Sequence, residues 1–328
     1  MSRLLWADRL KGCLIILVVL GHAIQHAFGP ACEDNHLWNI IYSFHMPAFM
    51  AVSGYLVYRP QAKRVNLSRR FLQLMVPFLA WSLIMFFLNP PYQARELASY
   101  ILKPDTSFWF LWVLFWIAVL FWVGDWLAER LRVKQEIIIG IFCVVLVAVM
   151  VFVDVRVLGM QFISYYFLFY VMGYYLHKYD GVMTTRLAVL IPLTILWAVL
   201  AWFWKMHSVP AFLAGIGLPM SLMNYGYRFV TAMVAVYVLL CASPSLLGYR
   251  DGHDNLLIFC GVWSLGIYVV HLLLMPYICN LLGQSLAPSI VALIAFLLAI
   301  SASLLVVFLL SKVGVTRRVL LGKLERKK

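Results

Sequence analysis

Charged residues are scarce in this sequence. Only 12% of its 328 residues are Asp, Glu, Lys or Arg, whereas 64% are hydrophobic, and the mean hydropathy is +0.92. Soluble domains carry about 25% charged residues, so this composition excludes an ordinary soluble enzyme and indicates a polytopic membrane protein. We predict an all-α fold: a bundle of membrane-spanning helices.

Acidic residues are the scarcest charged type, with 13 Asp and Glu against 26 Lys and Arg. All thirteen fall in predicted loops or at the edges of predicted spans, so no carboxylate lies in the middle of a span. Ion- and proton-coupled carriers commonly depend on buried carboxylates. This absence counts moderately against a secondary transporter.

Paired cysteines, repeats and low-complexity tracts are also missing. None of the six cysteines has metal or redox spacing, so we interpret them as small apolar residues. The basic start leads into an apolar run without a small-residue cleavage site, so we expect no signal peptide. We predict a single transmembrane domain over residues 1–328, with no attached soluble domain.

Ten apolar runs are long enough to cross a bilayer, some of them only with tilt, since a standard span takes about 20 residues. They lie at about 10–28, 38–58, 71–88, 108–124, 136–153, 161–177, 187–204, 225–242, 257–279 and 289–311. Segment 210–223 is interrupted by proline and glycine, and we interpret it as a loop or a shallow re-entrant turn.

The positive charges support this count. With ten spans and a cytoplasmic N-terminus, 21 of the 26 Lys and Arg fall on the cytoplasmic side. An odd number of spans would spoil this alternation, so we predict that both termini are cytoplasmic. The net charge of +13 then reflects topology and contact with lipid headgroups, and no nucleic-acid binding is expected.

The ionisable groups inside the predicted spans are the imidazoles of His22, His45 and His271. A neutral imidazole suits the removal of a proton from a hydroxyl, although a buried histidine can also simply bond a neighbouring helix. His22 and His26 have the spacing of two metal ligands, but there is no third ligand nearby, so we expect no metal.

His22 shares a helix face with a cation. Lys11 precedes it by eleven residues, close to three helical turns, and the rise between them is roughly 16 Å. A cation near the membrane surface and a titratable ring near the midplane on one stripe indicate a lined cavity.

Other candidates have two interpretations each. Arg69 and Arg70 directly precede the third span, and their guanidinium groups could hold phosphates at the mouth of a cavity. The surrounding basic loop could instead contact anionic lipid. Trp109 and Trp112 could stack on a sugar or adenine ring, or belong to an interfacial aromatic belt. Ser53 is a further candidate for substrate binding, or with its neighbouring glycine allows close helix approach.

With these residues in view, the chain resembles the acyltransferase 3 family of integral membrane acyltransferases, especially its fucose-4-O-acetylase-like members. Five blocks carry the resemblance over nearly the whole chain. They are Asp8-Arg9-Leu10-Lys11-Gly12 through His22, Phe44-His45-Met46-Pro47 with Phe49, Ser53 and Gly54, Trp109-Phe110-Leu111-Trp112, Gly173-Tyr174, and Ser264-Leu265-Gly266-Ile267-Tyr268 through His271. The family often begins its third span with R-x-x-R; here the series is Arg70-Phe71-Leu72-Gln73, so Gln73 keeps a hydrogen-bond donor but lacks the charge.

The resemblance implies an O-acetyltransferase in the inner membrane. It implies acetyl-CoA as the cytoplasmic donor, with phosphates held by Lys11, Arg69, Arg70 and Gln73. It implies an envelope carbohydrate or lipid-linked sugar as the acceptor and His22 as general base or acyl carrier, with His45 and His271 in supporting roles. A homo-oligomer is compatible with the sequence. The rival hypothesis is a transporter or exporter of a polysaccharide or lipid-linked intermediate.

Overall fold

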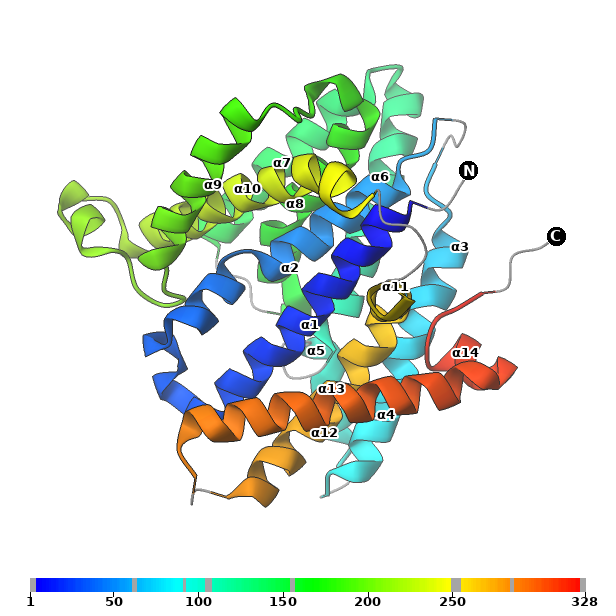
Figure 1. The fold of residues 1–328 in the computed structure, drawn as a ribbon. Helices are drawn as coiled ribbons and strands as arrows, with labels where there is room; N and C mark the ends of the chain where they lie inside the picture. The colour runs from blue at the N-terminus through cyan, green and yellow to red at the C-terminus, as the bar shows by residue number, and fades with distance from the viewer. Residues whose placement is uncertain are drawn as a thin grey trace. The chain divides into compact units, whose positions relative to one another are not determined.

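The structure is a computed structural model that describes residues 4–60, 64–90, 93–103, 108–153, 157–248, 255–283 and 286–324. Across these ranges the regular elements are all helices, and no strand occurs (Figure 1). The prediction of an all-α helix bundle is therefore confirmed.

Nine helices within the described ranges are long and apolar enough to cross a membrane. They are Leu5–Asp34, His36–Val57, Leu67–Leu88, Trp109–Leu131, Gln135–Phe152, Val157–Lys178, Met220–Leu247, Ser264–Leu282 and Pro288–Lys312. The remaining predicted run forms α9 (Leu187–Trp202), which is apolar but only 16 residues long. That length gives about 24 Å of helix, short of the ~30 Å hydrocarbon core. All ten runs are thus helical, and the cytoplasmic location of both termini stays a prediction.

In two predicted segments the observed helices differ from the prediction. The run at 257–279 is divided at Trp263 into α11 (Asn255–Val262) and α12 (Ser264–Leu282). The segment at 210–223 contains a short 3-10 helix, η6 (Ala211–Ile216), and α10 (Met220–Leu247) begins before the segment ends. Gly217, in the left-handed conformation with φ +77°, ends η6 and separates it from α10.

Two carboxylates lie farther inside helices than the sequence suggested. Asp8 is buried in the first turn of α1 (Leu5–Phe28), and Asp125 lies in α6 (Trp109–Leu131) six residues before its end. Asp105, Asp154, Asp251, Asp254 and Glu325 lie outside the described residues. Asp8 and Asp125 nevertheless lie in the first and last thirds of their helices, respectively.

The contacts divide the chain into two compact units, and each is described by itself. The single domain predicted for residues 1–328 stays a prediction. The first unit comprises Met1–Val52 and Tyr179–Val307. Its elements are α1, η1 (Gly29–Asp34), most of α2 (His36–Val57), η5 (Asp180–Val182), α9, η6, α10, α11, α12 and most of α13 (Pro288–Lys312).

The second unit comprises Ser53–Lys178 and Phe308–Lys328. Besides the ends of α2 and α13, its elements are α3 (Leu67–Arg70), η2 (Phe71–Met75), α4 (Val76–Leu88), α5 (Ala94–Leu102), α6, α7 (Gln135–Phe152), η4 (Val157–Gly159), α8 (Met160–Lys178) and α14 (Gly314–Val319). The segment η2 is π-helical.

In the first unit, α1 approaches α11 at backbone distance. A Cβ atom at Gly261 would collide with the carbonyl oxygen of Asp8, and one at Gly12 would collide with the carbonyl oxygen of Leu257. Small residues let membrane helices approach this closely. Because α1 also packs on α12 (Figure 1), the contact determines which turns of α1 and α12 face each other.

We expect Gly261→Val to destabilise the protein, because the new side chain must push α1 and α11 apart. Overpacking of this kind typically costs about 1–3 kcal/mol. The melting temperature in detergent measures the effect. Gly140→Val is the matched control, since Gly140 lies in α7 with no atom near its absent Cβ. Equal melting temperatures for the two variants would contradict the packing role of Gly261.

Candidate active site

The central feature of the first unit is a contact between two histidines that are 249 residues apart in the sequence. His22 lies on α1 and His271 on α12, and 2.9 Å separates Nδ1 of His22 from Nε2 of His271. Their rings are stacked with centroids 5.1 Å apart. The structure therefore brings together two of the three histidines that the sequence singled out.

The backbone around His271 determines which nitrogens carry protons. Nδ1 of His271 lies 2.8 Å from the carbonyl oxygen of Ile267, which can only accept, so this nitrogen donates. In a neutral ring Nε2 then has a lone pair and accepts the N–H of His22 Nδ1. That leaves the Nε2 lone pair of His22 free to take a proton from a substrate.

Exposure distinguishes the three rings. His271 and His45 are buried, whereas His22 is partly exposed and is the ring of the pair that a substrate can reach. Nδ1 of His45 donates to the carbonyl oxygen of Ile41 at 2.7 Å. The neutral His45 ring is therefore held in the same tautomer as His271, with a lone pair on Nε2.

Two further residues complete this cluster, and the sequence interpretation missed both. The ring of Tyr42 lies 4.8 Å from that of His45 and 6.3 Å from that of His22. Its hydroxyl donates to Oε1 of Gln25 at 2.6 Å. A signal existed: Tyr42 precedes His45 by three residues and Gln25 follows His22 by three, so each shares a helix face with a histidine.

This cluster suits proton transfer. In the ranges that the structure describes, no three His, Cys, Asp or Glu side chains are grouped so that they could hold a metal ion. His26, one turn after His22, is exposed. The basic nitrogen of His22 lies among neutral polar groups, and its other nitrogen is fixed by His271. Such an arrangement supports a general base or a nucleophile.

At the start of α1, the three charged residues of the first block have different environments. Lys11 forms an ion pair with Asp8 at 2.8 Å, and about 20% of its side chain is exposed. Arg9 is buried and donates to the carbonyl oxygen of Leu247 at 2.6 Å, tying α1 to the end of α10. Arg9 thus has a structural role, whereas Lys11 keeps access to solvent.

The other candidates for donor binding belong to the second unit. Arg69 is exposed on the short helix α3, whose N-cap Asn66 accepts from the Arg69 backbone N–H at 2.9 Å. Arg70 ends α3 and is partly exposed. Gln73 lies in the π-helical turn η2. π-Helical turns inside α-helices are frequent at functional sites.

The aromatic candidates take part in packing within the second unit. Trp109 stacks on Phe162 and Tyr166 of α8, with centroid distances of 4.9 and 5.1 Å. Trp112 is buried, and its Nε1 donates to the carbonyl oxygen of Leu158 at 2.9 Å. Their role in substrate binding stays a prediction.

Ser53 is partly exposed on α2 and is already engaged in a polar interaction. The adjacent Gly54 lies directly against the backbone carbonyl of Tyr170, so this part of α2 does allow close helix approach, as one interpretation of the sequence held. Substrate binding by Ser53 stays a prediction.

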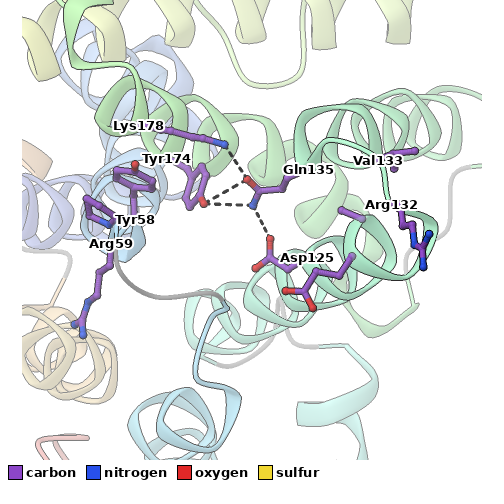
Figure 2. A pocket seen from close by; sticks show the side chains of 11 residues that line it. Tyr58, Arg59, Asp125, Arg132, Val133, Gln135, Tyr174 and Lys178 are labelled. Atoms are coloured by element: carbon purple, nitrogen blue, oxygen red, sulfur yellow. Dashed lines mark hydrogen bonds between the residues drawn. The ribbon is translucent and has the colours of Figure 1, made fainter.

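A polar pocket of about 480 Å³ lies where α6 and α8 end and α7 begins (Figure 2). Nε2 of Gln135 donates to Asp125 at 2.6 Å, and Lys178 donates to Oε1 of Gln135 at 3.3 Å. The hydroxyl of Tyr174 lies 3.3 Å from Nε2 of the same amide. One side chain thus joins three helices. No pattern in the sequence marks this pocket, because polar residues are ordinary at the ends of spans.

Comparison with known proteins identifies the family of this chain. A family model described as the acyltransferase domain matches residues 4–312. Nodulation protein NolL of Mesorhizobium japonicum is 32% identical over 121 residues, which are 33% of this chain and 32% of that protein. NolL of Sinorhizobium fredii is 31% identical over 155 residues, or 42% of each chain.

The matched stretches cover less than half the length of these relatives. No solved structure matches the chain. The family model, in contrast, extends over nearly all of it and includes the blocks that contain His22, His45 and His271. This chain therefore belongs to the acyltransferase 3 family of membrane proteins.

Proposed function

We propose that this membrane O-acyltransferase moves an acetyl group from cytoplasmic acetyl-CoA to a hydroxyl of an envelope carbohydrate or lipid-linked sugar, and that it works in the inner membrane. The observation that carries the proposal is the His22–His271 pair. Its geometry leaves a lone pair on Nε2 of His22, a partly exposed residue on an apolar helix. The full family match supplies the reaction class.

The donor enters from the cytoplasmic side in this proposal. Lys11, Arg69, Arg70 and Gln73 hold the phosphates of CoA, with guanidinium groups as the strongest partners. The ion pair with Asp8 fixes the Lys11 ammonium at the start of α1. The pantetheine arm spans the roughly 16 Å of helix rise between Lys11 and His22, so the thioester lies beside His22.

His22 acts as the base in the acyl transfer. Its Nε2 takes the proton of the acceptor hydroxyl while the hydroxyl oxygen attacks the thioester carbonyl carbon. When the carbon–sulfur bond breaks, the proton on Nε2 passes to the departing thiolate, giving CoA with a free thiol. His271 accepts from Nδ1 of His22 throughout, so it stabilises the protonated ring and keeps Nε2 directed at the substrate.

The same nitrogen also suits a two-step route. Nε2 of His22 then attacks the thioester carbonyl carbon, and CoA leaves as its thiolate. The acceptor oxygen next attacks the acetyl carbon on Nε2 while Nε2 of His45 takes the hydroxyl proton, which returns to the thiolate and leaves both rings neutral. In either route the oxygen of Tyr42, whose own proton is donated to Gln25, accepts from a neighbouring hydroxyl of the acceptor and orients it.

We expect His22→Ala to lower acetyl transfer by about 10²–10⁴-fold, the usual contribution of a positioned base. Transfer of labelled acetyl from acetyl-CoA in vesicles that contain the protein and an envelope glycan extract measures the effect. His26→Ala is the matched control, because His26 is exposed one turn farther along the same helix. Undiminished transfer by correctly inserted His22→Ala protein would remove His22 from the chemistry.

We expect His271→Leu to lower kcat by about 10–100-fold, the range found when a partner that orients a functional histidine is removed. KM for acetyl-CoA should change little, because His271 does not touch the donor in the proposal. Glutamine places an oxygen near the position of Nε2, so His271→Gln should retain more activity than His271→Leu. Equal kcat values for the two variants would argue against a positioning role.

We expect acetyl-CoA to raise the melting temperature of the detergent-solubilised protein saturably. A ligand at 100 times its Kd stabilises the folded state by about 2.7 kcal/mol. Replacing both Arg69 and Arg70 by Gln should shift saturation to higher acetyl-CoA concentrations. Stabilisation by glycan without any effect of CoA would favour an exporter over an acyltransferase.

A further inference from the structure

Pro77 explains why the third span begins with a π-helical turn. A proline in a helix cannot donate to the carbonyl four residues earlier, here that of Gln73, and its ring collides with that carbonyl. The chain widens instead: the N–H of Val76 bonds the carbonyl oxygen of Phe71, five residues back. The Gln73 carbonyl is thereby left without its usual partner in the helix.

The C-terminal part of the chain packs at this point. Nε1 of Trp81 donates to the carbonyl oxygen of Leu320 at 2.8 Å, and the side chain of Leu321 is 1% exposed. The short helix α14, just before these residues, packs on both η2 and α4. The helix α14 and the residues directly after it therefore cover the widened turn near the start of the third span.

Gly322 lies against the backbone of this turn. It has φ +61°, a conformation that favours glycine. A Cβ atom at this position would collide with the carbonyl oxygen of Gln73 and lie 3.2 Å from the ring of Pro77. Both the backbone conformation and the space therefore require glycine here.

Local bonds fix the path of this segment. The hydroxyl of Thr316 donates to the carbonyl oxygen of Leu310 at 2.6 Å, which holds the turn between α13 and α14. The N–H of Lys323 donates to the carbonyl oxygen of Arg317 at 3.0 Å, which turns the chain back after α14. The segment consequently reaches Gln73 as a defined structure.

We propose that residues 314–324, defined here as the C-terminal clamp, hold the η2 turn and thereby position Arg69, Arg70 and Gln73 for the polyphosphate part of the acyl donor. The link to the donor rests on the proposed function. The family match ends at residue 312, so the clamp lies beyond the matched residues.

Charge favours the same ligand chemistry. The helix α14, which contains Arg317 and Arg318, packs on η2, the turn that directly follows Arg69 and Arg70. Arg64 nearby in the sequence is already paired with Glu129 of α6. Guanidinium groups brought to one turn favour a ligand with several phosphates.

Two variants test the clamp. Gly322→Val adds a side chain where neither space nor backbone conformation permits one, and Trp81→Phe removes the bond to Leu320 but keeps an aromatic ring. Gly314→Val is the matched control, since a glycine in the same segment there faces open space. Hydrogen–deuterium exchange over 67–80 reports on the turn, and the kinetics of labelled acetyl transfer report on the donor site.

We expect faster exchange over 67–80 in Gly322→Val and Trp81→Phe but not in Gly314→Val. KM for acetyl-CoA should rise on the order of 10-fold, equivalent to about 1.4 kcal/mol of donor binding, with a much smaller change in kcat. Unchanged exchange in both variants overturns the clamp whatever the activity. Faster exchange with an unchanged KM overturns its role in donor binding. If the wild-type protein transfers no acetyl, the proposed function fails, and the exchange data still decide whether the clamp holds the turn.

Discussion

The hydrogen bond from Nδ1 of His271 to the carbonyl oxygen of Ile267 constrains the rest of the histidine cluster. A carbonyl can only accept, so this one contact fixes the tautomer of His271, then the direction of its bond with His22, and finally the position of the free lone pair. In this cluster His22 is oriented by a second imidazole, whereas the histidine of a Ser-His-Asp triad is oriented by a carboxylate. The acidic residues that the structure describes lie in loops or toward helix termini, which agrees with this arrangement, because an ionised carboxylate beside the histidines would be costly to bury.

That hydrogen-bond relay depends on backbone contacts elsewhere. His22 and His271 are in contact only at one axial position and one rotation of α1 relative to α12. A small shift of either helix would break the 2.9 Å contact. Gly12 and Gly261 lie against carbonyl groups of the opposing helix, which fixes the axial position of α1 against α11. Backbone atoms cannot move aside as a side chain can, so little displacement is possible. Arg9 adds a bond to the end of α10 on the same part of α1. The packing contacts and the His22–His271 contact therefore lie on one helix, α1.

The sequence predicted the helices well because apolar runs of sufficient length have no other stable structure in a membrane. It also singled out three histidines, since ionisable groups within spans are rare, and two of them are in contact in the structure. It did not predict that His22 pairs with His271 and not with His45, because such a pairing depends on how distant helices rotate against each other. Tyr42 and Gln25 were missed for another reason: polar residues near span ends are common, and only their spacing from a histidine marked them. The division at Trp263 follows from tertiary contacts of α11 that no local pattern records.

The polar side chains inside the helices show why His22 is different. His45, His271, Thr194 and Thr231 each bond the carbonyl four residues earlier in their own helix, at 2.7 to 2.8 Å. Such bonds satisfy a polar group without any second element, and each is compatible with a purely structural role. His22 instead depends on a partner from another helix, and its second nitrogen is left to a substrate. A buried group that is satisfied locally costs the bundle little, whereas one that requires a distant partner constrains two helices. Under the proposed function, that constraint has a purpose: it would hold His22 in one orientation while donor and acceptor change.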